Sequence, residues 1–171
     1  VRTVFNLLGP LVNPLRPNGQ VLGVATEDLL DPMAEALLCL DQERAVVVHG
    51  AGGLDEASLA GPNSLRILEN GVLRSEAIAP GDLGLQEASL DALRGGDLAR
   101  NQTILSELLQ GRGTRAQAEV VAFNSALVLW VAGVEMDLKS GAERALSALA
   151  EGLAWQRLER LRQGLTPPEG G

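Results

Sequence analysis

The chain is organised around the stretch Arg44-Ala-Val-Val-Val-His-Gly-Ala-Gly-Gly-Leu-Asp-Glu-Ala-Ser-Leu-Ala-Gly-Pro62. Its β-branched run, Ala45 to Val48, predicts a buried strand. Three glycines follow this strand directly, at Gly50, Gly52 and Gly53. Glycine permits backbone conformations that a side chain forbids, and it lets a ligand come close to the main chain. We therefore expect a ligand-binding loop immediately after the strand.

Two adjacent carboxylates in this loop, Asp55 and Glu56, are the candidate metal ligands. In open α/β sheets, ligands bind beyond the carboxyl ends of the strands. Magnesium keeps several waters and needs only one or two protein carboxylates, so the pair suits a hydrated Mg²⁺ that carries a phosphorylated substrate. The alternative is local, because Asp55 can also cap a helix that begins near Glu56. The dipeptide alone does not choose between these two interpretations.

The composition describes a globular, acidic protein. The 171 residues suffice for one domain with a real core, and 46% hydrophobic against 21% charged residues excludes a disordered chain. The net charge of -8 argues against a surface for nucleic acid or an anionic membrane. No apolar run is long enough to span a bilayer. The lone Cys39 lies in an apolar stretch, which predicts a core residue in a reducing, cytoplasmic compartment.

The first part of the chain predicts a strand–helix–strand unit. Gln20 to Ala25 has the pattern of a short strand, and apolar residues between positions 29 and 40 recur at helical spacing. Pro32 either takes the first helical position behind an Asp31 cap or kinks the helix. Together with the strand at positions 45–48, this order predicts a parallel pair joined by a right-handed crossover.

A hairpin follows this unit. The extended runs Ser64 to Leu68 and Val72 to Ile78 flank Asn70-Gly71, and Asn-Gly is the strongest short hairpin signal. We therefore expect an α/β fold. It has a mostly parallel sheet with an antiparallel hairpin, flanked by helices, and the second half of the chain is helical.

The helices of the second half have recognisable starts and patterns. Asp97 caps a helix that reaches about Leu109, and Thr114 starts a longer helix through Val131. The pattern of the longer helix is apolar most of the way round, so we expect it to be buried. A further amphipathic helix begins at Leu138 and continues through positions 155, 158 and 161.

Two polar residues could carry chemistry or simply hold structure. His49, the only histidine, ends the central strand and can act as a base or ligand, but a local hydrogen bond that holds the loop is the more common role. Asn124 lies inside the helix that starts at Thr114, where a satisfied structural hydrogen bond is the usual interpretation. We predict no catalytic acid, base or nucleophile in this chain.

Two segments together carry a family resemblance. Arg2-Thr-Val-Phe-Asn-Leu-Leu-Gly-Pro-Leu-Val-Asn-Pro14 resembles the signature loop of the anthranilate phosphoribosyltransferase family. Val47-Val-His-Gly50 with Gly53-Leu-Asp-Glu-Ala-Ser58 and Gly61-Pro62 resembles the metal-site loop of that family. Leu93-Arg-Gly-Gly-Asp97 with Asn101, and positions 124–133, resemble later family segments.

This resemblance implies an activity and a large α/β domain of the phosphoribosyltransferase and nucleoside phosphorylase-like type. The family transfers the phosphoribosyl group of phosphoribosyl pyrophosphate to the amine of anthranilate, in tryptophan biosynthesis, and works as a homodimer. The resemblance also implies that Asp55 and Glu56 hold Mg²⁺ on the pyrophosphate, and that Gly9 and Pro10 line the anthranilate path. The metal would neutralise the leaving group.

Some family parts are missing from this sequence. The glycine-rich phosphate loop (Gly-Thr-Gly-Gly-Asp), an upstream arginine and the small N-terminal helical domain do not occur in residues 1–171. We therefore expect residues 1–171 to be a C-terminal α/β domain fragment. We also expect the isolated chain to be inactive, and phosphoribosyl transfer by it would refute this.

Three other functions compete with this one. Pyrimidine nucleoside phosphorylases share the architecture, and phosphorolysis of thymidine or uridine would favour them. A family paralogue that binds nucleic acid is opposed by the net charge of -8. A non-catalytic interaction domain would leave Asp55 and Glu56 solvated, with no magnesium effect on substrate binding.

Overall fold

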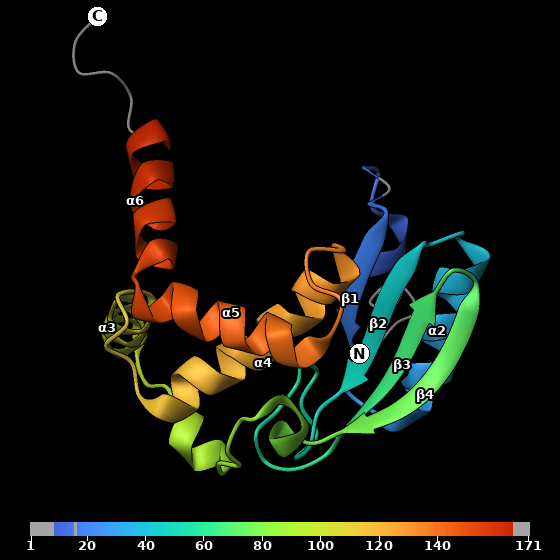
Figure 1. Cartoon of the computed structure of the whole chain (residues 1–171), viewed down its shortest axis with the longest axis horizontal. Coiled ribbons are helices and arrows are strands. Elements are labelled where there is room, and N and C mark those ends of the chain that lie inside the picture. The colour runs from blue at the N-terminus through green and yellow to red at the C-terminus, as the bar shows by residue number, and fades with distance from the viewer. Residues whose placement is uncertain (1–8, 16, 166–171) are drawn as a thin grey trace, which may run out of the picture.

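A four-stranded sheet lies between two helical layers (Figure 1). The computed structural model describes residues 9–15 and 17–165. The strand order is β1 (Gly19–Gly23), β2 (Arg44–His49), β3 (Asn63–Glu69) and β4 (Val72–Ile78). The segment at positions 1–8, with the first part of the signature loop, and the tail from position 166 lie outside the described residues.

The α/β class and the parallel β1–β2 pair are confirmed, but the sheet is not mostly parallel. In the described part of the chain, β2–β3 and β3–β4 are both antiparallel. The reason lies in the connection from Gly50 to Pro62, which forms a compact loop without a helix. A parallel return needs a crossover that carries the chain back over the sheet, and this loop instead reverses direction.

The hairpin is confirmed. Glu69 pairs with Val72 across the turn, and Asn70 and Gly71 both have positive φ, at 50° and 78°. Two successive left-handed residues match the right-handed twist of the flanking strands. Asparagine and glycine tolerate this conformation at low cost.

Both faces of β2 are buried, which explains its unbroken apolar run. Ala45 and Val47 pack in a core with α2 (Leu30–Cys39), whereas Val46 and Val48 pack in a second core with α4 (Arg115–Val131). All four side chains are at most 1% exposed. A strand covered by helices on both faces needs apolar residues at every position.

The start of α2 differs from both predicted alternatives. A 3₁₀ turn, Glu27–Leu29, precedes the helix, and Pro32 is the third residue of α2. The residue at the cap position is Leu29 and not Asp31. Proline is tolerated at the third position because the first N–H groups of a helix have no partner within it.

The second half of the chain is helical, as predicted. It contains α3 (Leu98–Leu109), α4, α5 (Leu138–Ala150) and α6 (Leu153–Leu165), with a short 3₁₀ turn at Leu90–Leu93. Two further 3₁₀ turns, Gly9–Val12 and Pro80–Leu83, lie in the first half. The caps are confirmed: Asp97 accepts a hydrogen bond from the Arg100 N–H at 2.8 Å, and Thr114 forms a capping box with Gln117.

The last predicted helix is in fact two helices. Gly152, with φ 67°, separates α5 from α6, and Figure 1 shows α6 turning off from the end of α5 that lies far from the sheet. The apolar spacing of this region fits a single helix, and the spacing alone places no stop at this glycine. A left-handed glycine is nevertheless a common helix terminator.

Cys39 is exposed at the end of α2 and is not a core residue. Val12, in the segment that resembles the signature loop, is 66% exposed. In the described ranges, no helix is long and apolar enough to cross a bilayer.

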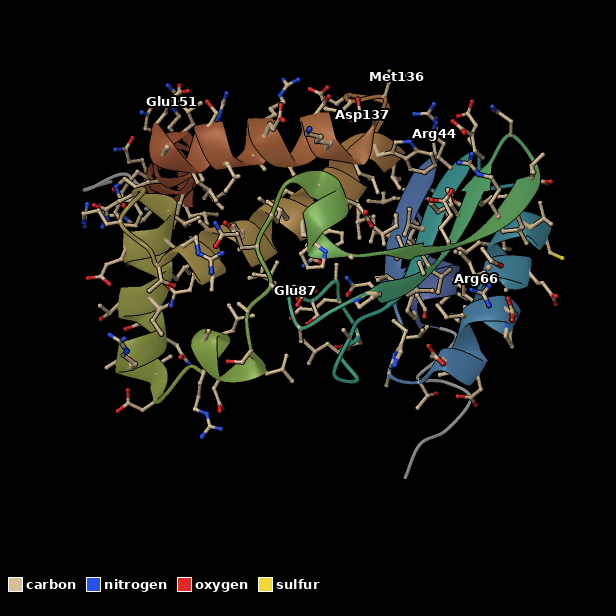
Figure 2. All side chains as sticks on the ribbon, turned by 60° about the horizontal axis from the view of Figure 1, so that its bottom comes forward. Arg44, Arg66, Glu87, Met136, Asp137 and Glu151 are labelled. Atoms are coloured by element: carbon tan, nitrogen blue, oxygen red, sulfur yellow. The ribbon has the colours of Figure 1, made fainter. Side chains whose placement is uncertain are left out.

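Two arginines fasten helices to opposite sides of the sheet. Figure 2 shows Arg66 of β3 on the side of α2 and Arg44 of β2 on the side of the α4 terminus. The Arg44 guanidinium donates to the Trp130 carbonyl oxygen at 3.1 Å and to Glu69 at 2.9 Å, and its centre lies 5.2 Å from the Trp130 ring centroid. These contacts tie the end of α4 to the start of β2.

Candidate functional site

The Asp55–Glu56 segment lies against the carboxyl ends of β1 and β2. A Cβ added to Gly23, the last residue of β1, would stand 1.6 Å from the Asp55 carbonyl oxygen. A Cβ added to Gly50, which follows β2, would stand 2.0 Å from the Glu56 carbonyl oxygen. Only glycine permits such close approach of two backbones. The space opened by Gly50 is therefore filled by the loop itself and not by a ligand.

The loop between these contacts turns tightly. Gly50 and Leu54 exchange backbone hydrogen bonds at 2.8 and 3.2 Å, and Gly52 and Gly53 have φ values of 85° and 82°. These positive values are the reason for the glycine pair. No helix begins near Glu56, so the interpretation of Asp55 as a helix cap is wrong.

Both carboxylates of the loop are exposed. Among the residues that the structure describes, neither side chain has a hydrogen bond or an ion pair. No group of three potential metal-ligating side chains occurs in the described ranges. The donor set thus fits a hard cation that takes few protein ligands and completes its shell with water and substrate oxygens, as Mg²⁺ does.

Asn63, at the start of β3, holds the two ends of the loop together. Its Oδ1 accepts from the N–H of Ala51 at 3.2 Å and from the N–H of Ser58 at 2.7 Å. Its Nδ2 donates to the carbonyl oxygens of Ser58, Gly61 and Ile78 at 3.1 to 3.2 Å. The side chain is fully buried and has no access to solvent. These hydrogen bonds therefore satisfy its polar atoms in place of water.

Asn124, in the middle of α4, holds the loop from the helix side. Its Oδ1 accepts from the Ala57 N–H at 2.9 Å, and its Nδ2 donates to the Ala57 carbonyl oxygen at 2.8 Å. Glu56 and Asn124 line the same cavity of about 780 Å³, whose other walls are mostly apolar side chains of α3, α4 and α5. The predicted structural hydrogen bonds of Asn124 are confirmed.

His49 also holds structure, as favoured. Its Nδ1 donates to the Val24 carbonyl oxygen at 2.9 Å, and the Val24 N–H donates to the Val48 carbonyl oxygen at 2.9 Å. Ser58 behind the carboxylates is buried, and its Oγ accepts from the Ala60 N–H at 3.0 Å. Both side chains thus bond the main chain and fix the backbone at the strand ends and in the loop.

Gly9 and Pro10 are not brought next to the carboxylates. The Pro10 carbonyl oxygen accepts from Gln20 Nε2 at 2.9 Å, which puts Pro10 beside the start of β1. Gly23, against which Asp55 packs, is three residues further, or about 10 Å along the strand. Pro10 lines a separate cavity of about 490 Å³ with the end of α2.

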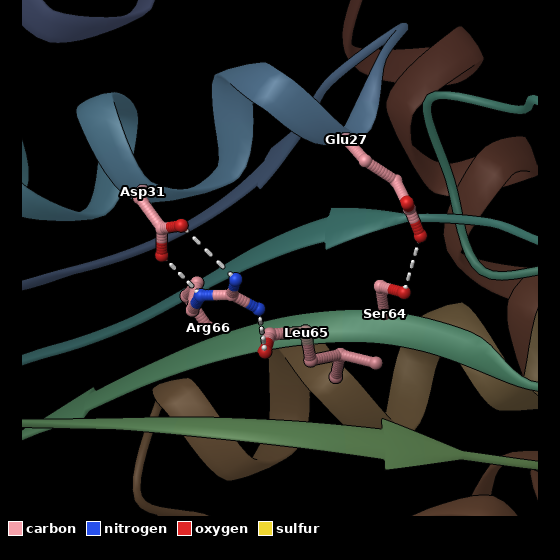
Figure 3. A network of polar contacts seen from close by, with 5 residues as sticks. All are labelled: Glu27, Asp31, Ser64, Leu65 and Arg66. Atoms are coloured by element: carbon pink, nitrogen blue, oxygen red, sulfur yellow. Dashed lines mark hydrogen bonds and ion pairs between the residues drawn. The ribbon is translucent and has the colours of Figure 1, made fainter.

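A charged network fastens the start of α2 to β3 close to the carboxyl end of β2 (Figure 3). Arg66 Nη2 donates to Asp31 at 3.2 Å, and the Ser64 hydroxyl donates to Glu27 at 2.8 Å. The hydrogen bonds from Arg66 hold the pKa of Asp31 below its ordinary value, and those to Asp31 raise the pKa of Arg66. Ser64 pairs with His49 across the sheet, so the network borders the strand end that carries the loop.

Sequence reasoning missed two residues that shape this site. Gly23 and Asn63 were not among the candidates, because their partners lie far along the chain. A glycine at the end of a strand was the available signal for Gly23, since such glycines mark a close approach of another backbone. No local signal pointed to Asn63.

A family model described as "Glycosyl transferase family, a/b domain" matches residues 1–155. An anthranilate phosphoribosyltransferase of Synechococcus sp. (strain WH7803) is 77% identical over 167 residues, which cover 98% of this chain and 48% of that protein. The enzyme of the same name from Parasynechococcus marenigrum (strain WH8102) is 67% identical over 165 residues, which cover 96% of this chain and 47% of that protein. The chain thus spans about half the length of these curated relatives.

Solved structures agree with these matches. Anthranilate phosphoribosyltransferase from Thermus thermophilus superposes with a TM-score of 0.84 at 43% identity, over 94% of this chain and 47% of that one. The enzyme from Saccharomyces cerevisiae, solved in complex with PRPP and Mg, superposes with a TM-score of 0.81 at 28% identity, over 93% of this chain and 46% of that one.

Proposed function

This chain belongs to the glycosyl transferase family through its a/b domain, and on that premise we propose that it is the C-terminal half of an anthranilate phosphoribosyltransferase. The whole protein would transfer the phosphoribosyl group of phosphoribosyl pyrophosphate to anthranilate. High identity to relatives of that name, over nearly all of this chain, supports the assignment.

The observation that carries the proposal is the pair Asp55 and Glu56. Both are exposed, without a partner in the described part of the chain, and held at the carboxyl ends of β1 and β2. Ligands of α/β sheets bind at such strand ends. Asp55 and Glu56 would hold Mg²⁺, and a Mg²⁺ ion bound there supplies positive charge that stabilises a pyrophosphate leaving group.

The aromatic substrate would lie away from these carboxylates. Gly9 and Pro10 match the family residues that line the anthranilate path, and their place beside the start of β1 fits an elongated site with two separate ends. No residue of this chain needs to act as a base, because an aromatic amine is already a competent nucleophile. The protein would work in the cytoplasm as a homodimer.

The site would be completed by the part of the relatives that this chain does not span. Asp55 and Glu56 supply negative charge only, so a second element must bind the phosphate oxygens. We therefore expect the isolated chain of 171 residues to have no transferase activity.

The test is transfer to anthranilate by the full-length protein, followed by the loss of anthranilate fluorescence with and without Mg²⁺. Asp55→Asn/Glu56→Gln should abolish most of the Mg²⁺-dependent rate. The matched control is Asp41→Asn/Glu43→Gln, which removes the same charge at the opposite end of the β2 strand. Equal rates in the wild type and the Asp55/Glu56 variant would remove the metal assignment, and phosphorolysis of thymidine or uridine in place of transfer would remove the substrate assignment.

A further inference from the structure

We propose that Asn124 is a positioning residue that holds the Glu56 carboxylate in place for the cation. This inference rests on the proposed function, in which Glu56 is a magnesium ligand. It gives a task to a helix residue that lies 67 positions from the loop it holds.

The contact is a two-point clamp on one residue of the loop. The side-chain amide of Asn124 bonds both the N–H and the carbonyl oxygen of Ala57, at 2.9 and 2.8 Å. Ala57 is fully buried and follows Glu56 directly. Because both polar groups of the Ala57 main chain are bound, this residue can neither slide along α4 nor rotate away from it.

The peptide group between Glu56 and Ala57 is also confined on its carbonyl side. The Glu56 carbonyl oxygen packs on the Cα of Gly50, so closely that a Cβ there would stand 2.0 Å away. The peptide that joins Glu56 to Ala57 is thus gripped between Asn124 and Gly50. The Glu56 side chain is not held by these contacts. It is exposed at the cavity that Asn124 also lines.

The amide of Asn124 is itself held in one orientation. Its Nδ2 also donates to the Val120 carbonyl oxygen, one turn back on α4, at 3.0 Å. An aliphatic side chain at this position would leave the Ala57 main chain unpaired in a buried place, which is costly. The clamp therefore needs a side chain with an acceptor and a donor together, as asparagine has.

A positioning role for Asn124 should change the Mg²⁺ affinity, whereas a purely stabilising role should change only the free energy of unfolding. Groups that orient a metal ligand without touching the metal alter metal affinity about 10- to 100-fold when they are removed. In full-length Asn124→Ala we therefore expect the Mg²⁺ concentration for half-maximal transfer to rise about 10-fold or more. The rate at saturating Mg²⁺ should fall much less.

A second measurement needs neither activity nor metal. Hydrogen exchange of the peptide that covers positions 50–58 should be faster in Asn124→Ala than in the wild type, with little change in β3 or α5. Asn124→Asp keeps the acceptor for the Ala57 N–H but replaces the donating Nδ2 by a carboxylate oxygen that faces the carbonyl oxygens of Ala57 and Val120. Because acceptors that face one another repel, it should accelerate exchange in the same peptide at least as much as Asn124→Ala. Ser125→Ala is the control, since Ser125 lines the same cavity on the same helix and should leave both measurements unchanged.

The outcomes separate the two proposals. A Mg²⁺ requirement within twofold of wild type in Asn124→Ala, or a shift as large in Ser125→Ala, would overturn the positioning role. If the wild-type protein transfers no phosphoribosyl group, the proposed function fails, and hydrogen exchange then decides the clamp alone. Unchanged exchange at positions 50–58 in both Asn124 variants would overturn it.

Discussion

Replacing Gly23 by alanine tests how the carboxylate loop is seated. The added Cβ would stand 1.6 Å from the Asp55 carbonyl oxygen and 2.5 Å from its carbonyl carbon, whereas ordinary contact begins at 3.4 Å. The Asp55 main chain must therefore retreat by the difference, about 1.8 Å. The atoms nearest to the added Cβ are all main-chain atoms of Asp55. No flexible side chain can therefore move aside to relieve the contact.

Two magnitudes follow from that displacement. Inserting one methyl group into a tight contact costs about 1 to 3 kcal/mol of folding free energy. A misplacement of about 1 Å in a positioned group can cost about 100-fold in rate. We expect full-length Gly23→Ala to stay folded, and to lose about 100-fold of its transfer rate at limiting Mg²⁺.

The assay is the Mg²⁺ dependence of transfer, measured beside urea unfolding of the same preparations. Gly164→Ala on α6 is the control, because its added Cβ meets no atom within 4 Å among the described residues outside the neighbouring helix backbone. In that helix, alanine should stabilise the protein by about 0.5 to 1 kcal/mol. Wild-type transfer and wild-type Mg²⁺ dependence in Gly23→Ala would refute the argument that the seat of the loop sets the carboxylates.

Three further predictions concern stability. Asn63→Ala removes an amide that serves five main-chain groups around the loop, so urea unfolding should show a loss of about 2 to 5 kcal/mol; a loss as small as that of an exposed site would mean that water replaces the amide. Arg44→Lys keeps the charge but replaces the two guanidinium nitrogens that separately bond the Trp130 carbonyl oxygen and Glu69 by a single nitrogen. It should cost about 1 to 3 kcal/mol in the same experiment, which an unchanged midpoint would contradict. The folded-state pKa of Asp31 is lowered by its hydrogen bonds from Arg66, so its contribution to stability is present above about pH 4 and is lost as the pH falls through the lowered pKa. The difference in urea midpoint between wild type and Asp31→Asn should therefore shrink from about pH 6 to about pH 2. The control is Asp28→Asn. A midpoint difference that does not change with pH would exclude the Asp31 charge as the cause of the stabilisation.

Elements with local signals were predictable. The β2 run, the Asn70-Gly71 turn and the caps at Asp97 and Thr114 occur where neighbouring residues create the preference. Such preferences act over a few residues, so no knowledge of the fold is needed to read them. The same holds for the Asp55–Glu56 pair, whose exposure follows from its place on a glycine-rich loop.

Long-range pairings were not predictable in the same way. The sequence of the Gly50–Pro62 connection is compatible with either direction for β3, and only the packed loop shows that β3 returns antiparallel to β2. The apolar spacing of positions 138–161 likewise fits one helix or two, and the break at Gly152 depends on how α6 packs on α3 and α5.

The chain's local chemistry thus specified its strands, its turn, its caps and its pair of carboxylates. The position of that pair is a property of the assembled protein, because its supports come from distant segments. Gly23 lies 32 residues before Asp55, and Asn124 lies 67 residues beyond Ala57. A backbone contact at Gly23 and an amide clamp at Asn124 exist only once the sheet and α4 have packed, since neither residue has any preference of its own for the loop it holds.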